Sequence, residues 1–304
     1  MDKDGWTFLC ACAPFTGGLF CARERDDLTE NDIVASTFYL WHEANPDPVA
    51  RWGIYNTVVN WRAQSMATIK PTGKKRITVA IGTRGQYFEV EPESRNEREG
   101  VISGRPGPLR RLVAIDDELI AIGMGRTVLR RRGLGIWDEI GPGSLDSDAG
   151  QIVGFEGIDG RSLDDFYVAG WGGEIWHREN GTWSQIDSPT NMNLNALTYA
   201  SDGKIYAVGD NGIVVIGANG SWELMESNRP ENLQDVVAFE GEVFVVTDFK
   251  ILRLTDDGLA PEDRFANNDR PTSCLSLLKA QDGVVSMGPK DLFRFTGKLW
   301  QRIL

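Results

Sequence analysis

Two stretches of the chain decide its fold: FYVAGWGGEIWHRENGTWSQI at residues 166–186 and IYAVGDNGIVVIGANGSWELM at residues 205–225. Each has a strand-like run that ends in glycine, a second run, a turn, and a third run that opens on tryptophan. Weaker copies occupy residues 120–140 and 285–303, and within each copy the glycine and the tryptophan lie 12 to 14 residues apart. The glycines are Gly123, Gly170, Gly209 and Gly288, and the tryptophans are Trp137, Trp183, Trp222 and Trp300.

The spacing between copies predicts the architecture. Starting at Gly82, successive glycines of this kind are 41, 47, 39 and 79 residues apart, and the last gap spans two units. A repeat of about 40 residues built from short strands is typical of propeller blades, each of which is a four-stranded antiparallel sheet. We therefore predict an all-β propeller. The repeated tryptophan is expected to open the outermost strand and to cover the seam between neighbouring blades.

The number of blades depends on the first 60 residues. Residues 61–304 divide into six repeat units, whereas residues 1–60 match the repeat poorly. This first segment still contains four strand-like runs, at Trp6–Ala13, Gly18–Arg23, Thr37–Trp41 and Val49–Tyr55. Four strands make one further blade, so we predict a single domain over residues 1–304 with seven four-stranded blades. The alternative is six blades plus an N-terminal cap. Since the chain ends on a predicted outer strand, we expect the ring to close by packing between the first and last blades.

The repeat also resembles a known group of bacterial propellers. A strand that ends in Tyr-Ala-Val-Gly (Tyr206–Gly209), followed by a second strand and then Asn-Gly-x-Trp (Asn219–Trp222), is similar to sialidase-like (BNR-like) and photosystem II assembly-factor-like repeats. The resemblance covers roughly Arg76–Leu304 and implies the fold. A full Asp-box is absent, because only its Gly-Thr-Trp end is present at Gly181–Trp183. Nothing marks the arginine cluster or the tyrosine nucleophile that sialidases need.

The composition favours a cytoplasmic protein without a membrane segment. No apolar run approaches the roughly 20 residues needed to cross a bilayer. The N-terminus is acidic before a short apolar stretch, whereas a secretory signal begins basic and has a longer apolar region. Four cysteines, Cys10, Cys12, Cys21 and Cys274, fit a reducing compartment. Cys10 and Cys12 are expected on one face of one strand. We interpret them and Cys21 as small buried residues, because neither histidine completes a zinc-ligand spacing.

No arrangement of residues points to catalysis. The two histidines, His42 and His177, lie beside aromatic residues in predicted strands, where a structural role is the commoner one. The chain has neither a phosphate-binding glycine loop followed by lysine nor a G-x-S-x-G turn. Acidic pairs such as Asp116-Asp117 lie in predicted turns, where solvated carboxylates are commoner than glycosidase pairs. We therefore predict no enzyme activity, no cofactor and no bound metal.

Charge divides the chain into sectors of opposite sign. Residues 61–135 carry 15 basic and 8 acidic side chains, whereas residues 136–304 carry 13 basic and 27 acidic ones. The formal net charge is −12. This acidity argues against a nucleic-acid partner, since surrounding carboxylates repel phosphates. It suits a basic protein partner, whose association is accelerated by complementary charge. Solubility is the simpler explanation of the same charge.

Together these features favour a protein that is monomeric alone and binds another protein. Immunity proteins that neutralise bacterial toxins combine them, in particular those against nucleases delivered by type VI or contact-dependent systems. On this hypothesis, acidic loops cover the toxin's basic substrate-binding surface. Glu156, for example, directly follows the predicted inner strand Ile152–Phe155. Two alternatives remain open: an assembly-factor-like scaffold, and a propeller that binds or cleaves glycans. The candidate contacts are Asp146, Asp148, Glu156, Asp164, Asp165, Trp171, Glu174, Asp210, Glu231, Asp256 and Asp257.

Overall fold

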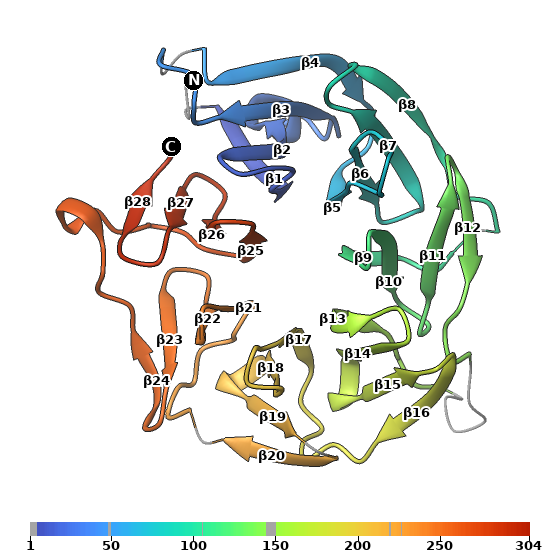
Figure 1. Cartoon of the computed structure of the whole chain (residues 1–304), viewed down its shortest axis with the longest axis vertical. Coiled ribbons are helices and arrows are strands. Elements are labelled where there is room, and N and C mark those ends of the chain that lie inside the picture. Colours follow the sequence, from blue (N-terminus) through green and yellow to red (C-terminus); the bar gives the residue numbers. More distant parts are fainter. Residues whose placement is uncertain (1–4, 48–49, 105, 144–149, 219, 226) are drawn as a thin grey trace.

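The computed structural model describes residues 5–47, 50–104, 106–143, 150–218, 220–225 and 227–304. Seven four-stranded sheets form a ring around a central axis (Figure 1). Neighbouring strands within each sheet are antiparallel and follow one another in sequence. The prediction of seven four-stranded blades is therefore confirmed. The alternative of six blades with a cap is wrong, because the first 60 residues contribute a complete sheet of four strands.

The blades are numbered from the N-terminus, with their strands given from the axis outward. Blade 1 consists of β1 (Trp6–Cys12), β2 (Gly18–Arg25), β3 (Ser36–His42) and β4 (Trp52–Val59). Blade 2 consists of β5 (Ala63–Ile69), β6 (Ile77–Gly82), β7 (Gln86–Glu91) and β8 (Asn96–Val101). Blade 3 consists of β9 (Leu109–Ile115), β10 (Glu118–Gly123), β11 (Val128–Gly133) and β12 (Ile136–Glu139).

The remaining blades follow the same order. Blade 4 consists of β13 (Phe155–Ser162), β14 (Asp165–Gly170), β15 (Ile175–Glu179) and β16 (Thr182–Ile186). Blade 5 consists of β17 (Leu194–Tyr199), β18 (Ile205–Gly209), β19 (Val214–Ala218) and β20 (Ser221–Met225). Blade 6 consists of β21 (Asp235–Phe239), β22 (Glu242–Val246), β23 (Ile251–Thr255) and β24 (Gly258–Pro261). Blade 7 consists of β25 (Ser276–Ala280), β26 (Gly283–Met287), β27 (Leu292–Phe295) and β28 (Trp300–Arg302).

The links between strands form two faces. Four antiparallel strands return the chain to the side on which the blade began, so every inner strand starts on the same side. We call this side the top face. It carries the links from each outer strand to the next inner strand and the links between second and third strands. The bottom face carries the other links. The short helix α1 (Asp26–Thr29) lies in the top-face link between β2 and β3.

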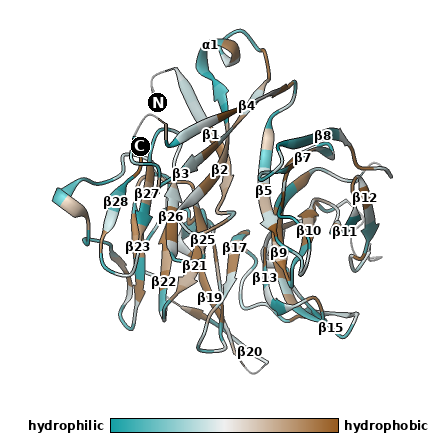
Figure 2. Ribbon diagram, turned by 45° about the horizontal axis from the view of Figure 1, so that its top comes forward, coloured by the Kyte–Doolittle hydropathy of each residue, from teal (hydrophilic) through white to brown (hydrophobic). Residues whose placement is uncertain are grey.

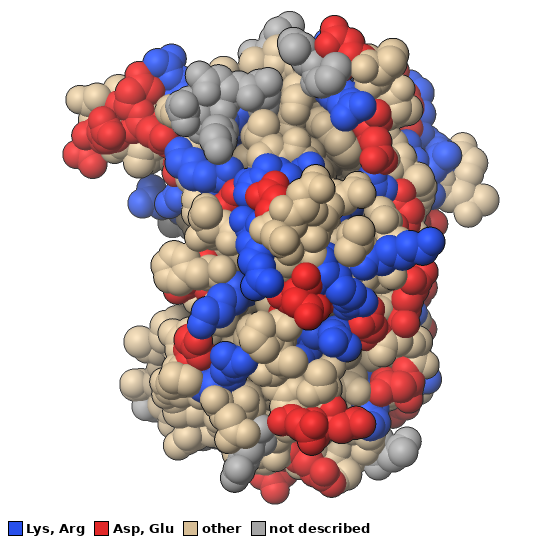
Figure 3. Space-filling model, turned by 90° about the vertical axis from the view of Figure 1, so that its left-hand side faces the viewer, with Lys and Arg blue, Asp and Glu red and all other residues tan. Residues whose placement is uncertain are grey.

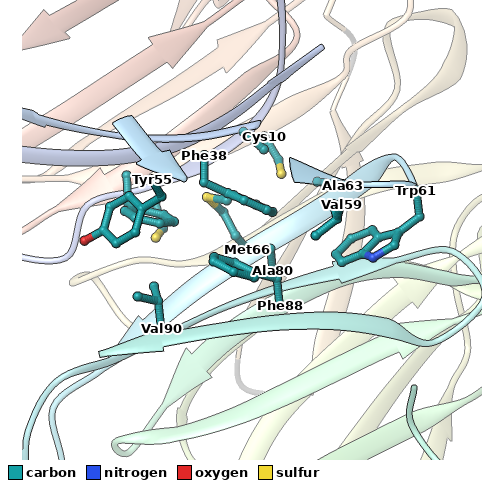
Figure 4. Packing of buried hydrophobic residues seen from close by; sticks show 13 residues of the cluster. Cys10, Phe38, Tyr55, Val59, Trp61, Ala63, Met66, Ala80, Phe88 and Val90 are labelled. Carbon is teal, nitrogen blue, oxygen red and sulfur yellow. The ribbon is translucent and has the colours of Figure 1, made fainter. Parts of the chain in front are cut away.

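Buried apolar residues fill the seams between the blades. At the seam between blades 1 and 2, Phe38 of β3 stacks on Phe88 of β7 with ring centroids 4.2 Å apart. Tyr55 and Met66 belong to the same buried cluster (Figure 4). Because each sheet is covered by a neighbour on both sides, alternate residues of a strand pack against different blades. The apolar area that drives folding is therefore shared among seven seams.

The repeated tryptophans cover these seams, as predicted. Trp183 donates a hydrogen bond of 2.6 Å from blade 4 to the link that follows β12 of blade 3. The ring of Trp222 in blade 5 lies 5.7 Å from that of Tyr167 in blade 4. Trp300 of blade 7 is buried, with its ring edge-on to Phe244 of blade 6 at 5.5 Å. These tryptophans thus join blades 4, 5 and 7 to the blade that precedes each of them.

The repeated glycines allow one link to pass close to a strand end. A Cβ atom at Gly170 or Gly209 would lie 1.9 Å from the carbonyl oxygen of Gly154 or Asn193, respectively. No side chain fits at that distance. The same two carbonyls accept backbone hydrogen bonds of 3.0 Å from the residues that follow the glycines. In these two blades the glycine therefore lets the link that enters the blade bond to the turn beside it.

The ring closes between blades 1 and 7 without a shared strand. The amide of Phe8 donates to the carbonyl of Pro289 at 2.9 Å, and Lys290 Nζ donates to the carbonyl of Trp6 at 2.6 Å. Leu292 of β27 lies in one buried cluster with residues of β1, β2 and β3. Closure by packing between two complete blades is the arrangement that the sequence predicted.

One strand begins later than predicted. The inner strand of blade 4 was expected at Ile152–Phe155, but β13 begins at Phe155 and Ile152 is 68% exposed. The strand could not be predicted correctly from the sequence, because β13 contains glycines and glycine is a poor strand former. A Cβ atom at Gly157 would lie 2.7 Å from the amide nitrogen of Leu197 in blade 5, so close packing near the axis requires glycine there. Glu156, which we predicted in a loop, is consequently a strand residue.

Candidate partner-binding surface

The predicted contact residues are divided between the two faces of the propeller. Asp146 and Asp148 lie outside the described residues. The residues at the top face are Glu156, Trp171, Glu174, Asp210 and Glu231. Those at the bottom face are Asp164, Asp165, Asp256 and Asp257. Because a single interface covers one face of a disc, these residues do not form one surface.

Glu156 and Trp171 meet at the top end of the central channel. Trp171 Nε1 donates to Glu156 Oε1 at 2.8 Å, and Arg110 Nε lies 3.3 Å from the same oxygen. Trp171 is the first residue of a short 3-10 turn, η2 (Trp171–Gly173). One oxygen of Glu156 is therefore engaged within the protein, and the indole is held beside the channel mouth.

Glu174 stabilises the fold through an ion pair between two blades. Its carboxylate receives the guanidinium of Arg126, with Nε donating to Oε2 at 2.8 Å and a second hydrogen bond to Oε1. The Arg126 side chain is only 2% exposed, and its Cζ lies 5.5 Å from the ring centre of Trp176. Removing the acid from such a pair takes a counter-charge away from a buried cation, which is destabilising. Glu174 is therefore not available to neutralise a partner's cation.

Two further predicted residues are held in ion pairs. Asp165 accepts a hydrogen bond from His177 at 2.8 Å and pairs with Arg161. Burial raises the pKa of Asp165, but the bonds from His177 and Arg161 outweigh it and hold the pKa below its usual range. Glu231 pairs with Lys250 at 2.8 Å, and this hydrogen bond lowers the pKa of Glu231. Both carboxylates are thus ionised at neutral pH, but each already has its cation.

Other top-face carboxylates have no ion pair among the described residues. Asp210 accepts from Nδ2 of Asn193 and of Asn195, at 3.1 Å each. Asp248 accepts from Gln234 Nε2 at 3.0 Å, and Asp187 is exposed. Amide partners hold a carboxylate in place without cancelling its charge. These three aspartates therefore leave negative charge on the top face over blades 4 to 6.

The bottom face also exposes acidic side chains. Asp164, Asp256 and Asp257 are exposed and have no ion pair in the described part of the chain. Acidity alone does not distinguish the two faces, so a second property is needed.

Exposed apolar side chains supply that property. Large apolar residues exposed in top-face links are Ile33, Val34, Ile152, Phe249 and Leu275, whereas those in described bottom-face links are Leu134 and Leu299. Phe249 is 68% exposed, and a hydrogen bond of 2.7 Å from Cys274 N to Asp248 O brings its turn beside Leu275. These residues could not be identified from the sequence, because a single apolar residue in a loop carries little information.

The basic sector is largely neutralised within the protein. Arg131 lies 2.8 Å from Glu89, Arg132 lies 2.5 Å from Asp138, and Arg130 pairs with Glu118. Figure 3 faces a different edge of the disc, that of blades 6 and 7, and basic and acidic side chains are interspersed there as well. The run of arginines at 130–132 is therefore not a patch of unpaired cations.

The central channel contains side chains of both signs. It encloses a cavity of about 640 Å³ lined by inner strands of all seven blades. Arg111 of blade 3 and Asp235 of blade 6 form an ion pair of 2.9 Å between blades that are not neighbours. Asp235 is buried and also accepts from the amide of Leu277 at 3.0 Å. Like Glu156, Asp235 is held by an arginine at the upper end of the channel.

The cysteines are buried in blades 1 and 7. Cys10 and Cys12 share the cluster between blades 1 and 2, as expected for one face of β1, whereas Cys21 packs toward blade 7. Burial raises the pKa of the Cys21 thiol to about 12, and it also raises the pKa of Cys10 and Cys12. Among the described residues, no three histidine, cysteine or acidic side chains are grouped so as to hold a metal ion. In the same part of the chain, no helix has the length and apolar character of a membrane span.

Solved structures confirm the fold. The structure of YCF48 bound to a D1 peptide superposes with a TM-score of 0.68 and 14% identity, covering 98% of this chain and 97% of that one. The WD40 propeller domain of Doa1 gives a TM-score of 0.68 and 12% identity, covering 97% and 93% of the two chains. At such identities the likeness concerns the fold alone. The predicted resemblance to assembly-factor-like propellers holds at that level.

Sequence comparison gives a closer relative. No family model matches the chain. The immune protein Tsi7 of Pseudomonas aeruginosa, however, is 34% identical over 292 residues, which cover 93% of this chain and 92% of Tsi7. The two proteins thus align over nearly their whole lengths. This protein belongs to the family of the immune protein Tsi7.

Proposed function

We propose that this protein neutralises a nuclease toxin by covering the toxin's basic substrate-binding surface with the top face of the propeller. The observation that carries the proposal is the 34% identity to an immune protein over 93% of the chain. Immunity requires a toxin to bind, so the partner is a cognate toxin. A binding role also fits the channel carboxylates Glu156 and Asp235, which are both held by arginines.

The top face offers the two properties that interfaces combine. Asp187, Asp210 and Asp248 supply negative charge, and Phe249 and Leu275 supply apolar area beside it. Stable interfaces have an apolar centre and a polar rim. We include Glu156, Trp171 and Glu231 in this surface by their place on the face, and Asp146 and Asp148 by their place in the sequence between β12 and β13. The four predicted residues on the bottom face are not included.

The proposed mechanism is electrostatic imitation of the substrate. A nuclease binds phosphates with lysine and arginine, and a row of carboxylates presents a similar pattern of negative charge. Complementary charge accelerates association and orients the two proteins. Bound toxin then has no room for nucleic acid. The net charge of −12 strengthens the long-range attraction.

We further propose that the protein acts in the cytoplasm as a monomer, against a toxin delivered by a type VI or contact-dependent system. All four cysteines are free thiols, which supports a reducing compartment. Internal pairing of the arginines of blade 3 supports a protein partner over nucleic acid.

A binding titration across salt tests the proposal. The binding partner in this titration is the cognate toxin, purified with its catalytic residue substituted. We expect the affinity to fall about tenfold or more between roughly 50 mM and 500 mM salt, because salt screens charge pairs at an interface. An affinity that ignores salt would contradict the electrostatic mechanism. Absence of binding at every salt concentration would contradict the function itself.

A further inference from the structure

An insertion in blade 1 distinguishes this blade from the others. The link between β2 and β3 spans ten residues, 26–35, whereas the corresponding links of the other six blades span three or four residues. We call residues 26–35 the spur. It contains α1 and stands clear of the disc at the edge of blade 1 (Figure 2). Figure 3 shows acidic side chains gathered on a projection at the upper left, where the spur leaves the disc.

The spur exposes two adjacent aliphatic side chains. Ile33 is 52% exposed and Val34 is 50% exposed, and neither belongs to the buried clusters of blade 1. Glu30 and Asp32 beside them are exposed and have no ion pair among the described residues. Adjacent apolar residues rimmed by charge are typical of a surface that becomes buried in a complex. An Ile-Val pair that is exposed to water does not stabilise the spur itself.

Backbone hydrogen bonds fix the shape of the spur. The amide of Ile33 donates to the carbonyl of Leu28 at 2.9 Å, and the amide of Asp32 donates to the carbonyl of Thr29 at 3.0 Å. Asp32 has a φ of 58°, which reverses the chain so that residues 33–34 follow the helix closely. A segment that is ordered before binding loses less conformational entropy when its partner arrives.

The base of the spur is anchored to blades 1 and 7. Asp26 accepts a hydrogen bond of 2.7 Å from Thr7 Oγ1 in β1 and one of 2.6 Å from Lys290 Nζ. Lys290 lies in the top-face link between β26 and β27. Burial raises the pKa of Asp26, but the bonds from Lys290 and Thr7 outweigh it and lower the pKa. The anchor is therefore ionised and intact at neutral pH.

We propose that the spur is a docking element for the toxin, in which Ile33 and Val34 enter an apolar pocket rimmed by lysine or arginine side chains that face Glu30 and Asp32. The inference rests on the proposed function, because it takes the basic toxin as the occupant. Charge complementarity supports that occupant, since a surface that binds phosphates is basic. The spur rises from the same top face that carries Asp187, Asp210 and Asp248, so one partner on that face can contact the spur and these aspartates together.

Matched pairs of substitutions test the spur. Ile33→Ser with Val34→Ser removes the apolar contacts without adding charge. The control is Ile54→Ser with Val58→Ser in β4 on the rim of blade 1, where the same residue types are 51% and 60% exposed. We expect the spur variant to bind the inactivated toxin about tenfold or more weakly, because hot-spot residues lie in desolvated pockets. The control variant should bind like the wild-type protein, and both should unfold at the wild-type temperature.

The outcomes separate the two proposals. If the wild-type protein binds the toxin and the spur variant binds within about twofold of it, the spur is not a docking element, although the function stands. If the wild-type protein does not bind, the proposed function fails, and the spur proposal falls with it. Hydrogen exchange of the wild-type complex provides a readout that needs no variant. Slower exchange of the amides of residues 28–34 in the complex is expected, and unchanged exchange there overturns the inference.

Discussion

Single acidic residues of this protein often serve its own fold, and Asp291 is a clear case. One carboxylate oxygen accepts from the amides of Thr272 and Ser273 at 2.9 Å each, and the other receives Arg302. Burial raises the pKa of Asp291, but the bonds from Thr272 and Arg302 outweigh it and lower the pKa. The ionised carboxylate thus joins the link that enters blade 7 to the outer strand of that blade.

Replacing Asp291 by asparagine should destabilise the protein at neutral pH. In either orientation, the NH2 group of the asparagine would face hydrogen-bond donors where the aspartate has an accepting oxygen. The free energy of unfolding should therefore fall by about 1–3 kcal/mol at pH 7. A carboxyl whose pKa is lowered on folding stabilises the protein above its unfolded pKa, near 3.9 for aspartate, and loses that contribution as the pH falls through the folded pKa. The difference in the free energy of unfolding between wild type and variant, measured by urea unfolding, should therefore become smaller below about pH 4. A difference that stays constant to pH 3 would mean that ionisation of Asp291 is not its source.

At the scale of single residues, the sequence predicted where charged side chains lie but not which residues pair with them. Acidic residues in turns could be identified from the sequence, yet Glu174 pairs with Arg126, which lies 48 residues away in another blade. Such a pair depends on how two blades sit against each other, which no local pattern encodes. For the same reason the sequence could not separate Asp210, held by amides, from Glu231, held by a lysine.

At the scale of elements, prediction succeeded where local patterns decide the structure. Short strands, glycine turns and seam-covering tryptophans follow from alternation and spacing, so the blades could be placed from the repeat. Two features of the elements were not predicted. The start of β13 was hidden by glycines that the packing near the axis requires, and α1 with the rest of the spur has no counterpart in the other blades. Both departures arise where tertiary contacts replace the repeat as the determinant of structure.

The closing seam should be as strong as the other seams. Leu292 is fully buried between blades 7 and 1, and Leu252 is 1% exposed between blades 5 and 6. Replacing either leucine by alanine should lower the free energy of unfolding by about 2–5 kcal/mol, because each removes buried area and leaves a cavity. Chemical unfolding followed by tryptophan fluorescence measures both variants. A loss below about 1 kcal/mol for Leu292→Ala alone would show that the ring does not depend on this seam.

At the scale of the whole molecule, family membership agrees with the features read from the sequence. The prediction that the chain is not an enzyme is confirmed by its relationship to an immune protein. The division of charge between sectors remains visible in the sequence, but the structure shows that the basic sector is paired internally. What distinguishes the top face is the combination of carboxylates that have no ion pair within the described ranges with exposed apolar side chains and the spur.

The central claim is that the toxin binds the top face, and a matched pair of triple variants tests it most directly. The top-face variant carries Asp187→Asn, Asp210→Asn and Asp248→Asn, and the bottom-face variant carries Asp164→Asn, Asp256→Asn and Asp257→Asn. Both change the net charge equally, so a difference in affinity for the inactivated toxin at low salt reports position rather than total charge. We predict a loss of about tenfold or more for the top-face variant and less than about twofold for the bottom-face variant. Equal losses, or a greater loss for the bottom-face variant, would contradict the account.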